Sequence, residues 1–308
     1  MPFILPFATI KINMSYKISV LKRKDWPPLL EEINQLPDKL FYAGAIPDWK
    51  RKLLCVVGAR KNTSYGKEAT ETFIEGLKGY PITIVSGLAF GIDSIAHRAA
   101  MKNNLPTISV PGSGLDLEVL HPQSHTKLAQ EIVDSGGTLM NEFEPEFKAT
   151  QWSFPQRNRI MAGMSHATLV IEAEKKSGTL ITARLAIEYN RDVLTLPGSI
   201  FNTTSQGPHM LIRLGATPIR DSDDILEALH LQKENDGEDG ADDERKYFDC
   251  SEKEMLIVKI LIEPLPRDEI LRQAQNEHQI PVGETQTLLS LLELKGLIKE
   301  TLGEIRLA

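Results

Sequence analysis

The stretch LLCVVGARKNTSYG, residues 53–66, decides the fold class. A short apolar run ends in a glycine, and a polar turn then leads into a helical segment, which is the pattern of a β-strand, a tight turn and a helix. A helix that begins behind a strand offers free amides and a positive dipole end to an anion. Arg60 lies in this turn and adds donors suited to phosphate oxygens. The stretch predicts a phosphate-binding sheet edge, although an arginine in an ordinary surface turn would look the same.

The alternation of strand and helix continues to residue 214. The predicted strands are 53–57, 83–85, 107–110, 138–140, 167–171 and 193–196, and the predicted helices are 64–78, 91–103, 124–134, 155–164, 180–190 and 209–214. Strands that alternate with helices form a parallel sheet with helices on both faces. The fold class is therefore α/β, with a doubly wound, mostly parallel sheet.

Composition divides the chain into four segments. Residues 1–52, rich in proline near their centre, are expected to be an irregular N-terminal lead-in to the α/β domain, residues 53–231. Residues 232–246 read QKENDGEDGADDERK, which can bury little apolar surface and predicts an acidic linker. Residues 247–308 read as three short amphipathic helices followed by two strands, an order that resembles a small winged-helix domain.

The net charge of −7 is unevenly distributed. Residues 1–231 carry 25 basic and 24 acidic side chains, whereas residues 247–308 carry 7 and 11. A near-neutral domain can hold single-stranded nucleic acid in a local basic groove. The acidic C-terminal domain is a poor reader of duplex DNA, so we expect a protein contact there. Two distant cysteines and the lack of a signal peptide or membrane-length apolar run predict a cytoplasmic protein with no membrane association.

Further glycine turns follow the later strands. SGLAFGID begins at Ser86, PGSGLD at Pro111 and PGS at Pro197. The carboxyl ends of parallel strands share one edge, so these turns predict a crevice for an extended phosphate-bearing ligand. Asp93 either accepts a hydrogen bond from a base or sugar or caps the following helix. The candidate binding residues of these turns are Gly58, Ser86, Gly87, Gly91, Asp93 and Gly112.

The stretch KATQWSFPQRNR, residues 148–159, sets two aromatic rings beside three cations. A base can stack on Phe154 or Trp152 while basic side chains reach phosphates, which suits single strands better than duplex. Alternatively the arginines pair with carboxylates such as Glu142 and both rings lie in the core. The candidates here are Lys148, Gln151, Phe154, Arg157, Asn158 and Arg159. SGTLITA, residues 177–183, adds Gly178 and Thr179 at a helix start, where a simple N-cap is equally expected.

Six motifs, in this order, resemble the DprA/Smf family of DNA-processing proteins: GARKNTSYG, SGLAFGID, PGSGLD, FPQRNRIMAGMS, SGTLITA and LPGSIFNTTSQGPHMLIRLGA. The resemblance implies an extended Rossmann-like domain and sequence-independent binding of single-stranded DNA. It also implies a homodimer that loads a RecA-type recombinase during natural transformation and recombination. Arg60 and Phe154 match the family's DNA-contacting arginine and aromatic residue. The chain departs from the family at Gln151, where many members carry lysine.

We expect a binding protein with no catalytic activity and no cofactor. No GxxxxGK[ST] motif occurs, which argues against a P-loop ATPase. His121 and His125 lack an HExxH context and are expected to be surface histidines rather than metal ligands. The alternative is a nucleotide-binding phosphoribohydrolase of the lysine-decarboxylase-like type, which shares the layout. That family uses a loop glutamate on the ribosyl bond, and Thr182 occupies the matching position here.

Overall fold

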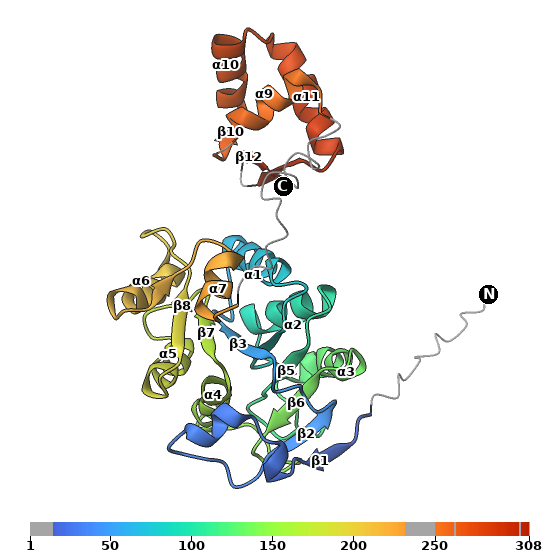
Figure 1. The fold of residues 1–308 in the computed structure, drawn as a ribbon, viewed down its shortest axis with the longest axis vertical. Helices are drawn as coiled ribbons and strands as arrows, with labels where there is room; N and C mark the ends of the chain where they lie inside the picture. Colours follow the sequence, from blue (N-terminus) through green and yellow to red (C-terminus); the bar gives the residue numbers. More distant parts are fainter. Residues whose placement is uncertain (1–14, 232–249, 262, 302, 308) are drawn as a thin grey trace, which may run out of the picture. The chain divides into compact units, whose positions relative to one another are not determined.

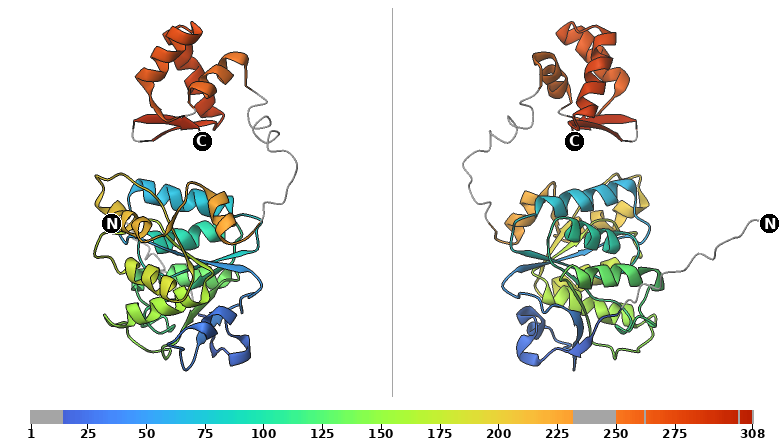
Figure 2. Two further views of the ribbon diagram at one scale, coloured as in Figure 1. Left: turned by 60° about the vertical axis from the view of Figure 1, so that its left-hand side comes forward. Right: turned by 90° about the vertical axis from the view of Figure 1, so that its right-hand side faces the viewer.

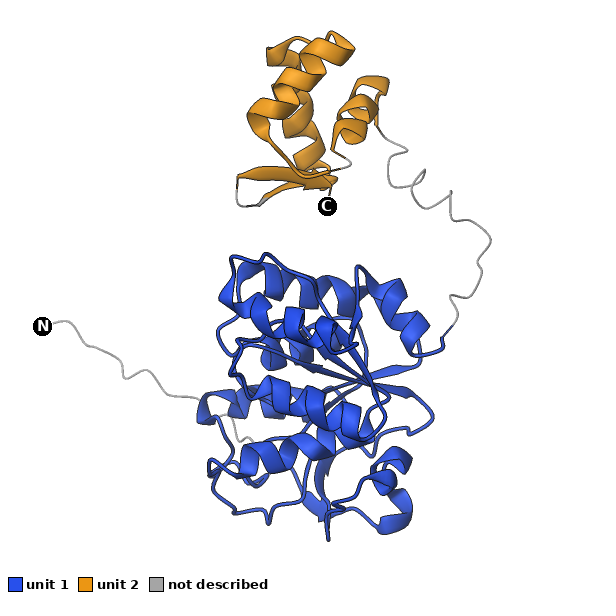
Figure 3. Cartoon of the chain, turned by 90° about the vertical axis from the view of Figure 1, so that its left-hand side faces the viewer, with its two compact units in different colours: residues 1–233 blue, residues 234–308 orange. Residues whose placement is uncertain are grey.

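The computed structural model describes residues 15–231, 250–261, 263–301 and 303–307. The chain forms two compact units, divided after residue 233 (Figure 3). Each unit buries its own hydrophobic residues. The predicted acidic linker, residues 232–246, lies outside the described residues.

The first unit is built on one nine-stranded sheet of order β1-β2-β6-β5-β4-β3-β7-β8-β9 (Figure 1). Its strands are β1 (Ile18–Val20), β2 (Phe41–Gly44), β3 (Lys52–Val57), β4 (Ile82–Ser86), β5 (Thr107–Ser109), β6 (Thr138–Asn141), β7 (Ala167–Val170), β8 (Asp192–Thr195) and β9 (Thr217–Pro218). Within the run from β6 through β3 to β9, neighbouring strands are parallel to one another. After β3 the chain adds strands on one side, and from β7 it adds them on the other. The point between β3 and β7 is therefore the topological switch point, where ligands bind in such sheets.

Helices cover both faces of the sheet (Figure 2). They are α1 (Ser64–Gly76), α2 (Ile92–Lys102), α3 (Thr126–Asp134), α4 (Ser153–Met164), α5 (Thr179–Glu188), α6 (Gln206–Arg213) and α7 (Ser222–Ala228). Side chains alternate along β3: Leu54 packs with α1, α2 and α7, whereas Leu53 and Cys55 pack with α4, α5 and α6. The predicted doubly wound, mostly parallel fold is confirmed. All six predicted strands are present as β3 to β8 and all six predicted helices as α1 to α6, with ends shifted by at most three residues.

The lead-in, expected to be irregular, contributes two strands to the sheet. β2 pairs antiparallel with β6, and β1 pairs antiparallel with β2, so both extend one edge. Between them, Trp26 and Leu30 are buried in the same core as α4. The segment is thus part of the first unit. Its strands are short and lie among prolines, so no clear alternation of apolar residues marks them in the sequence.

The second unit contains α9 (Glu252–Ile260), α10 (Arg267–His278) and α11 (Val282–Leu294). Its antiparallel sheet has the order β10-β12-β11, formed by β10 (Leu265–Pro266), β11 (Ile298–Thr301) and β12 (Glu304–Leu307). Three helices and a terminal hairpin follow the expected order, and the winged-helix assignment remains a prediction. Within the described residues of the chain, no helix is both long and apolar enough to cross a membrane.

Candidate nucleic-acid interface

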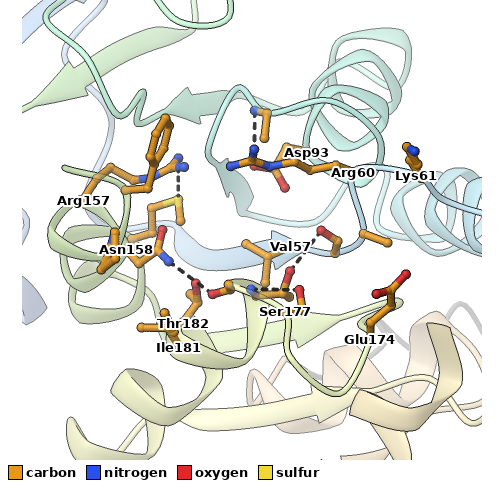
Figure 4. Close-up of a pocket in the computed structure, with 18 residues that line it drawn as sticks. Val57, Arg60, Lys61, Asp93, Arg157, Asn158, Glu174, Ser177, Ile181 and Thr182 are labelled. Carbon is orange, nitrogen blue, oxygen red and sulfur yellow. Dashed lines mark hydrogen bonds between the residues drawn. The ribbon is translucent and has the colours of Figure 1, made fainter. Parts of the chain in front are cut away.

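A pocket of about 380 Å³ opens at the switch point of the sheet. Its walls come from the loop after β3, the first turns of α4 and the turn before α5 (Figure 4). Segments more than 100 residues apart in the sequence therefore meet at one edge. This is where the glycine turns predicted a crevice.

Hydrogen bonds fasten the turn before α5 to the other two walls. The Thr179 hydroxyl donates to the carbonyl of Gly58 at 3.0 Å, and the Asn158 amide donates to the carbonyl of Gly178 at 3.5 Å. The Ser177 hydroxyl accepts from the amide of Thr179 at 3.2 Å. Gly58, Asn158, Gly178 and Thr179 all line the pocket. Their bonds to one another fix the width of its floor.

Phe154 stands at the mouth of the pocket, half-buried, on the first turn of α4. The Arg60 guanidinium carbon lies 5.4 Å from the centre of its ring, a cation–π distance. The His121 ring meets it edge to face, with centroids 5.5 Å apart. Gly112 lies against the ring, because a Cβ there would come within 2.6 Å of Phe154 Cδ1. The ring is therefore held by two loops, one after β3 and one after β5, while part of it stays open to a ligand.

Behind the mouth lies a buried pair of opposite charges. Asp93 is 5 % exposed and Arg157 is 4 % exposed, and both line the pocket. Both press on Gly87, where a Cβ would lie 1.9 Å from Arg157 Nη1 and 2.6 Å from Asp93 Oδ2. Burial raises the pKa of the Asp93 carboxyl, while the positive charge of Arg157 opposes that shift. Asp93 accepts from the amide of Ala89 at 3.3 Å, so it braces the loop before α2.

Arg157 and Arg159 are both used inside the fold. Arg157 donates to the carbonyl of Val110 and contacts Met161 Sδ at 3.5 Å. Arg159 lies outside the pocket, buried, where it donates to Glu142 and to the carbonyl of Gln35. This corrects the expectation that Arg159 reaches the ligand: the alternative of pairing with Glu142 is what the structure contains. Arg157 borders the pocket as a buried brace rather than as a free cation.

The remaining candidates shape or flank the site. Ser86 is buried and donates to the carbonyl of Val56 at 2.7 Å. Gly91 has φ +74°, and a Cβ there would lie 2.2 Å from the carbonyl oxygen of Ala59, so the loop requires glycine. Lys148 and Gln151 are exposed on the segment before α4 and do not line the pocket. These four residues were predicted as contacts, and the structure does not bring them to the pocket surface.

Sequence reasoning missed several residues of the pocket, among them Lys61, Glu174, Ser177, Ile181 and Thr182. The signal was available, because each follows β3 or β7 at the carboxyl edge that the glycine turns indicate. His121 and His125 were expected to be surface histidines; His121 is exposed, but His125 is buried, so that prediction was wrong for His125. The contact of His121 with Phe154 joins the loop after β5 to α4 and has no local sequence signature.

A doubly wound sheet with an arginine and an aromatic ring at its switch point defines a Rossmann-like ligand-binding protein. Residues 17–230 match the family DNA recombination-mediator protein A. The chain belongs to this family of DNA-processing proteins, also called DprA or Smf. It is 37 % identical over 281 residues to Protein Smf of Escherichia coli, covering 89 % of this chain and 72 % of that protein. It is 40 % identical over 201 residues to DNA processing protein DprA of Streptococcus pneumoniae, covering 65 % and 70 %.

Two solved structures are similar in fold and in sequence. DprA from Streptococcus pneumoniae aligns with a TM-score of 0.64 and 37 % identity, over 68 % of this chain and 74 % of that one. DprA from Helicobacter pylori, described in a single-stranded DNA binding mode, aligns with a TM-score of 0.61 and 28 % identity, over 70 % and 96 %. Both confirm the Rossmann-like fold of the first unit.

Proposed function

We propose that the chain binds single-stranded DNA without sequence preference at the switch-point pocket and loads a RecA-type recombinase onto it in the cytoplasm. This would serve natural transformation and recombination. The observation that carries the proposal is the placement of Arg60 over Phe154 at the carboxyl edge of β3. Family membership supports it, as does the similarity to Helicobacter pylori DprA, a protein with a single-stranded DNA binding mode.

Two parts of a nucleotide find matching chemistry at the pocket mouth. The guanidinium of Arg60 provides fork-like donors for a phosphate, with Lys61 next to it. The open part of the Phe154 ring provides a surface for a base, and stacking of this kind contributes about 1–3 kcal/mol per base. Because every base has a flat face, stacking tolerates any sequence. Binding without sequence preference follows.

The arrangement favours single strands over duplex. Bases in a duplex are already stacked on one another, so only an unpaired base can lie on Phe154. The second unit offers little to a duplex either. Four of its cations pair with its own carboxylates: Lys253 with Glu284, Arg267 with Glu300, Arg272 with Glu269, and Lys295 with Glu254. Cations held in this way release few counterions on binding DNA.

The homodimer and the transfer to a recombinase rest on family membership. The loop after β8 exposes Ile200 by 77 % and Phe201 by 90 %, and α6 ends beside the exposed Leu214. His209 of α6 is hydrogen-bonded to the carbonyl of Gly198, which ties this loop to the helix. A second copy of the chain is proposed to cover these apolar side chains. The oligomeric state of Phe201→Glu, compared with that of the unmodified chain by sedimentation, tests this point. If both form the same dimer, the loop is not part of the interface.

The central test is a titration of labelled oligothymidine and of the matching duplex at two salt concentrations. We expect tighter binding of the single strand and weaker binding at high salt. Equal affinity for both DNA forms would overturn the proposal. Recombinase assembly on the oligothymidine is then followed with and without the protein. If the protein does not shorten the lag before the recombinase assembles, the loading role is excluded and the binding role still stands.

The phosphoribohydrolase alternative has one supporting observation. Glu174 lines the pocket, so a carboxylate is present although Thr182 stands where that family has glutamate. Thr182 is buried, and Glu174 comes from the loop after β7. Incubation with nucleoside 5′-monophosphates distinguishes the two functions. The binding proposal expects no free base, and release of a base that Glu174→Gln abolishes would establish the enzyme instead.

A further inference from the structure

His121 does not line the pocket itself but contacts Phe154 at its mouth, although no motif marks it. Its exposed ring contacts Phe154 edge to face, with centroids 5.5 Å apart and ring planes at 64°. Its backbone amide donates to the Ser113 hydroxyl at 3.0 Å, which fixes the loop independently of the imidazole. Arg60 from the loop after β3, His121 from the loop after β5 and Phe154 from the first turn of α4 thus come together. The imidazole is the member of this trio whose charge changes near neutral pH.

We propose that His121 is a further contact residue for the DNA strand and makes the affinity for single-stranded DNA depend on pH. The proposal rests on the proposed function, because the ligand is the same strand. The neutral imidazole extends the aromatic surface of Phe154. The protonated imidazole donates from both nitrogens and adds a positive charge beside the phosphate that Arg60 holds.

The surroundings of His121 set the direction of the effect. The charge that bears on it from another loop is the Arg60 guanidinium, whereas its contacts from α4 and from its own loop, the Phe154 ring and the Ser113 hydroxyl, are uncharged. Partial burial and Arg60 together lower the pKa of His121 below its ordinary value. The free protein therefore holds a neutral ring at neutral pH. A bound phosphate favours the charged ring, so affinity rises as the pH falls.

Besides His209, which is hydrogen-bonded to the carbonyl of Gly198, three other histidines have their rings engaged within the fold. His97 is fully buried and hydrogen-bonded to Thr107, and burial lowers its pKa to about 3. His125 is buried against Phe90 and hydrogen-bonded to the carbonyl of Leu88. The ring of His166 accepts from the amide of Leu53. Unlike His121, none of these three rings contacts Phe154. Burial lowers the pKa of His97 and of His166, so protonation of these two affects folding stability, which a melting curve reports separately from binding.

The test measures oligothymidine affinity of the full chain between about pH 8 and pH 6, at two salt concentrations. We expect the affinity to rise roughly three- to tenfold on acidification, as for one added charged contact. The dependence on salt should steepen by about 0.7 in the logarithmic slope, as for one further counterion released from a single strand. His121→Gln should remove both effects. His121→Phe should also remove both, because a phenyl ring carries no proton to gain or lose.

His230→Gln is the matched control, since His230 is exposed at the end of α7 and does not line the pocket. It should behave as the unmodified chain. Failure of the unmodified chain to bind oligothymidine at any pH would overturn the proposed function itself. Binding with pH and salt dependences that survive in both His121→Gln and His121→Phe would overturn only the role of His121. Melting curves show whether each variant is folded. If His121→Gln does not fold, His121→Phe alone tests the role of His121.

Discussion

The Arg60 guanidinium carbon lies 5.4 Å from the centre of the Phe154 ring, although one residue follows β3 and the other begins α4. In the proposed binding mode, a base stacked on this ring meets the guanidinium at the edge of the ring. The cation proposed to hold a phosphate and the ring proposed to hold a base therefore form one unit rather than two independent contacts. Their contributions to binding should not be additive.

A double-mutant cycle measures this coupling. Arg60→Ala should weaken oligothymidine binding by about 1.5–3 kcal/mol, and Phe154→Ala by about 1–3 kcal/mol. The double variant should lose about 0.5–1 kcal/mol less than the sum, since either change already breaks the cation–π contact. Lys102, exposed at the end of α2, is the control position. The binding free energies lost in Lys102→Ala and Arg60→Ala should simply add in the double variant. Strict additivity of Arg60 and Phe154 would contradict the shared site.

Phe154 should matter more for binding than for stability. Its ring is half-buried at the pocket mouth, whereas Phe143 is 6 % exposed and packs on Phe147. Phe143→Ala should lower the free energy of unfolding by about 3–5 kcal/mol, and Phe154→Ala by less than half of that. Thermal melting of both variants checks the comparison. An equal loss of stability would assign Phe154 to the core and leave the exposed Trp152 as the stacking residue.

Gly112→Ala should damage binding through Phe154. The added Cβ would lie 2.6 Å from Phe154 Cδ1, so the ring must move off its position. We expect a loss of oligothymidine affinity of about tenfold, comparable with partial loss of stacking. Gly283→Ala is the matched change, because a Cβ there meets nothing within 4 Å and the residue belongs to the second unit. If both alanines bind alike, the position of the Phe154 ring does not set the affinity.

Arg157 should behave as a structural residue and Arg60 as a ligand contact. Arg157→Ala leaves the buried Asp93 carboxylate without its opposing charge and should lower the free energy of unfolding by about 3–5 kcal/mol. The Arg157→Ala protein that remains folded should bind with an unchanged dependence on salt. Arg60→Ala should instead keep the stability and flatten the logarithmic salt slope by about 0.7. A flattened slope with unchanged melting in Arg157→Ala would place that guanidinium on a phosphate.

His97 should make folding stability fall on acidification. Burial lowers its pKa from 6.5 to about 3, so between these values the unfolded chain binds a proton that the folded chain refuses. The free energy of unfolding contributed by His97 is therefore present above pH 6.5 and is lost as the pH falls toward 3. His97→Asn removes the titrating group while keeping a polar atom near Thr107. Urea titrations at several pH values should give a smaller pH slope for this variant, and equal slopes would exclude His97 as the cause.

The strands and helices of the α/β domain could be predicted because their signals are local. Runs such as Leu53–Val57 are apolar, short and followed by glycine, and the intervening segments have helical periodicity. The edge strands β1 and β2 could not, since their pairing depends on β6, about 100 residues away. Helix α7 was not predicted although it carries a local signal: Asp221 caps it, and two acidic residues open it.

The site was predictable in location but not in the role of each side chain. Arg60 and Phe154 reach the pocket because a strand end and a helix start determine where they lie. Arg157 and Arg159 belong to a helix that is buried on nearly all sides from Arg157 to Met164, and a charged residue in the sequence does not reveal that its helix is central. His121 meets Phe154 only through the fold. Contacts of this kind depend on tertiary packing, which periodicity does not encode.

The close fit of Gly87 against Arg157 and of Gly112 against Phe154 constrains how this family can diverge. At each glycine, a side chain from the distant helix α4 occupies the space that a Cβ would need. We expect a methyl group at position 112 to require a compensating change at position 154, whereas one at position 87 meets only the ends of the Arg157 and Asp93 side chains. An unrelated glycine loop grafted at this edge of the sheet would lack these partner side chains.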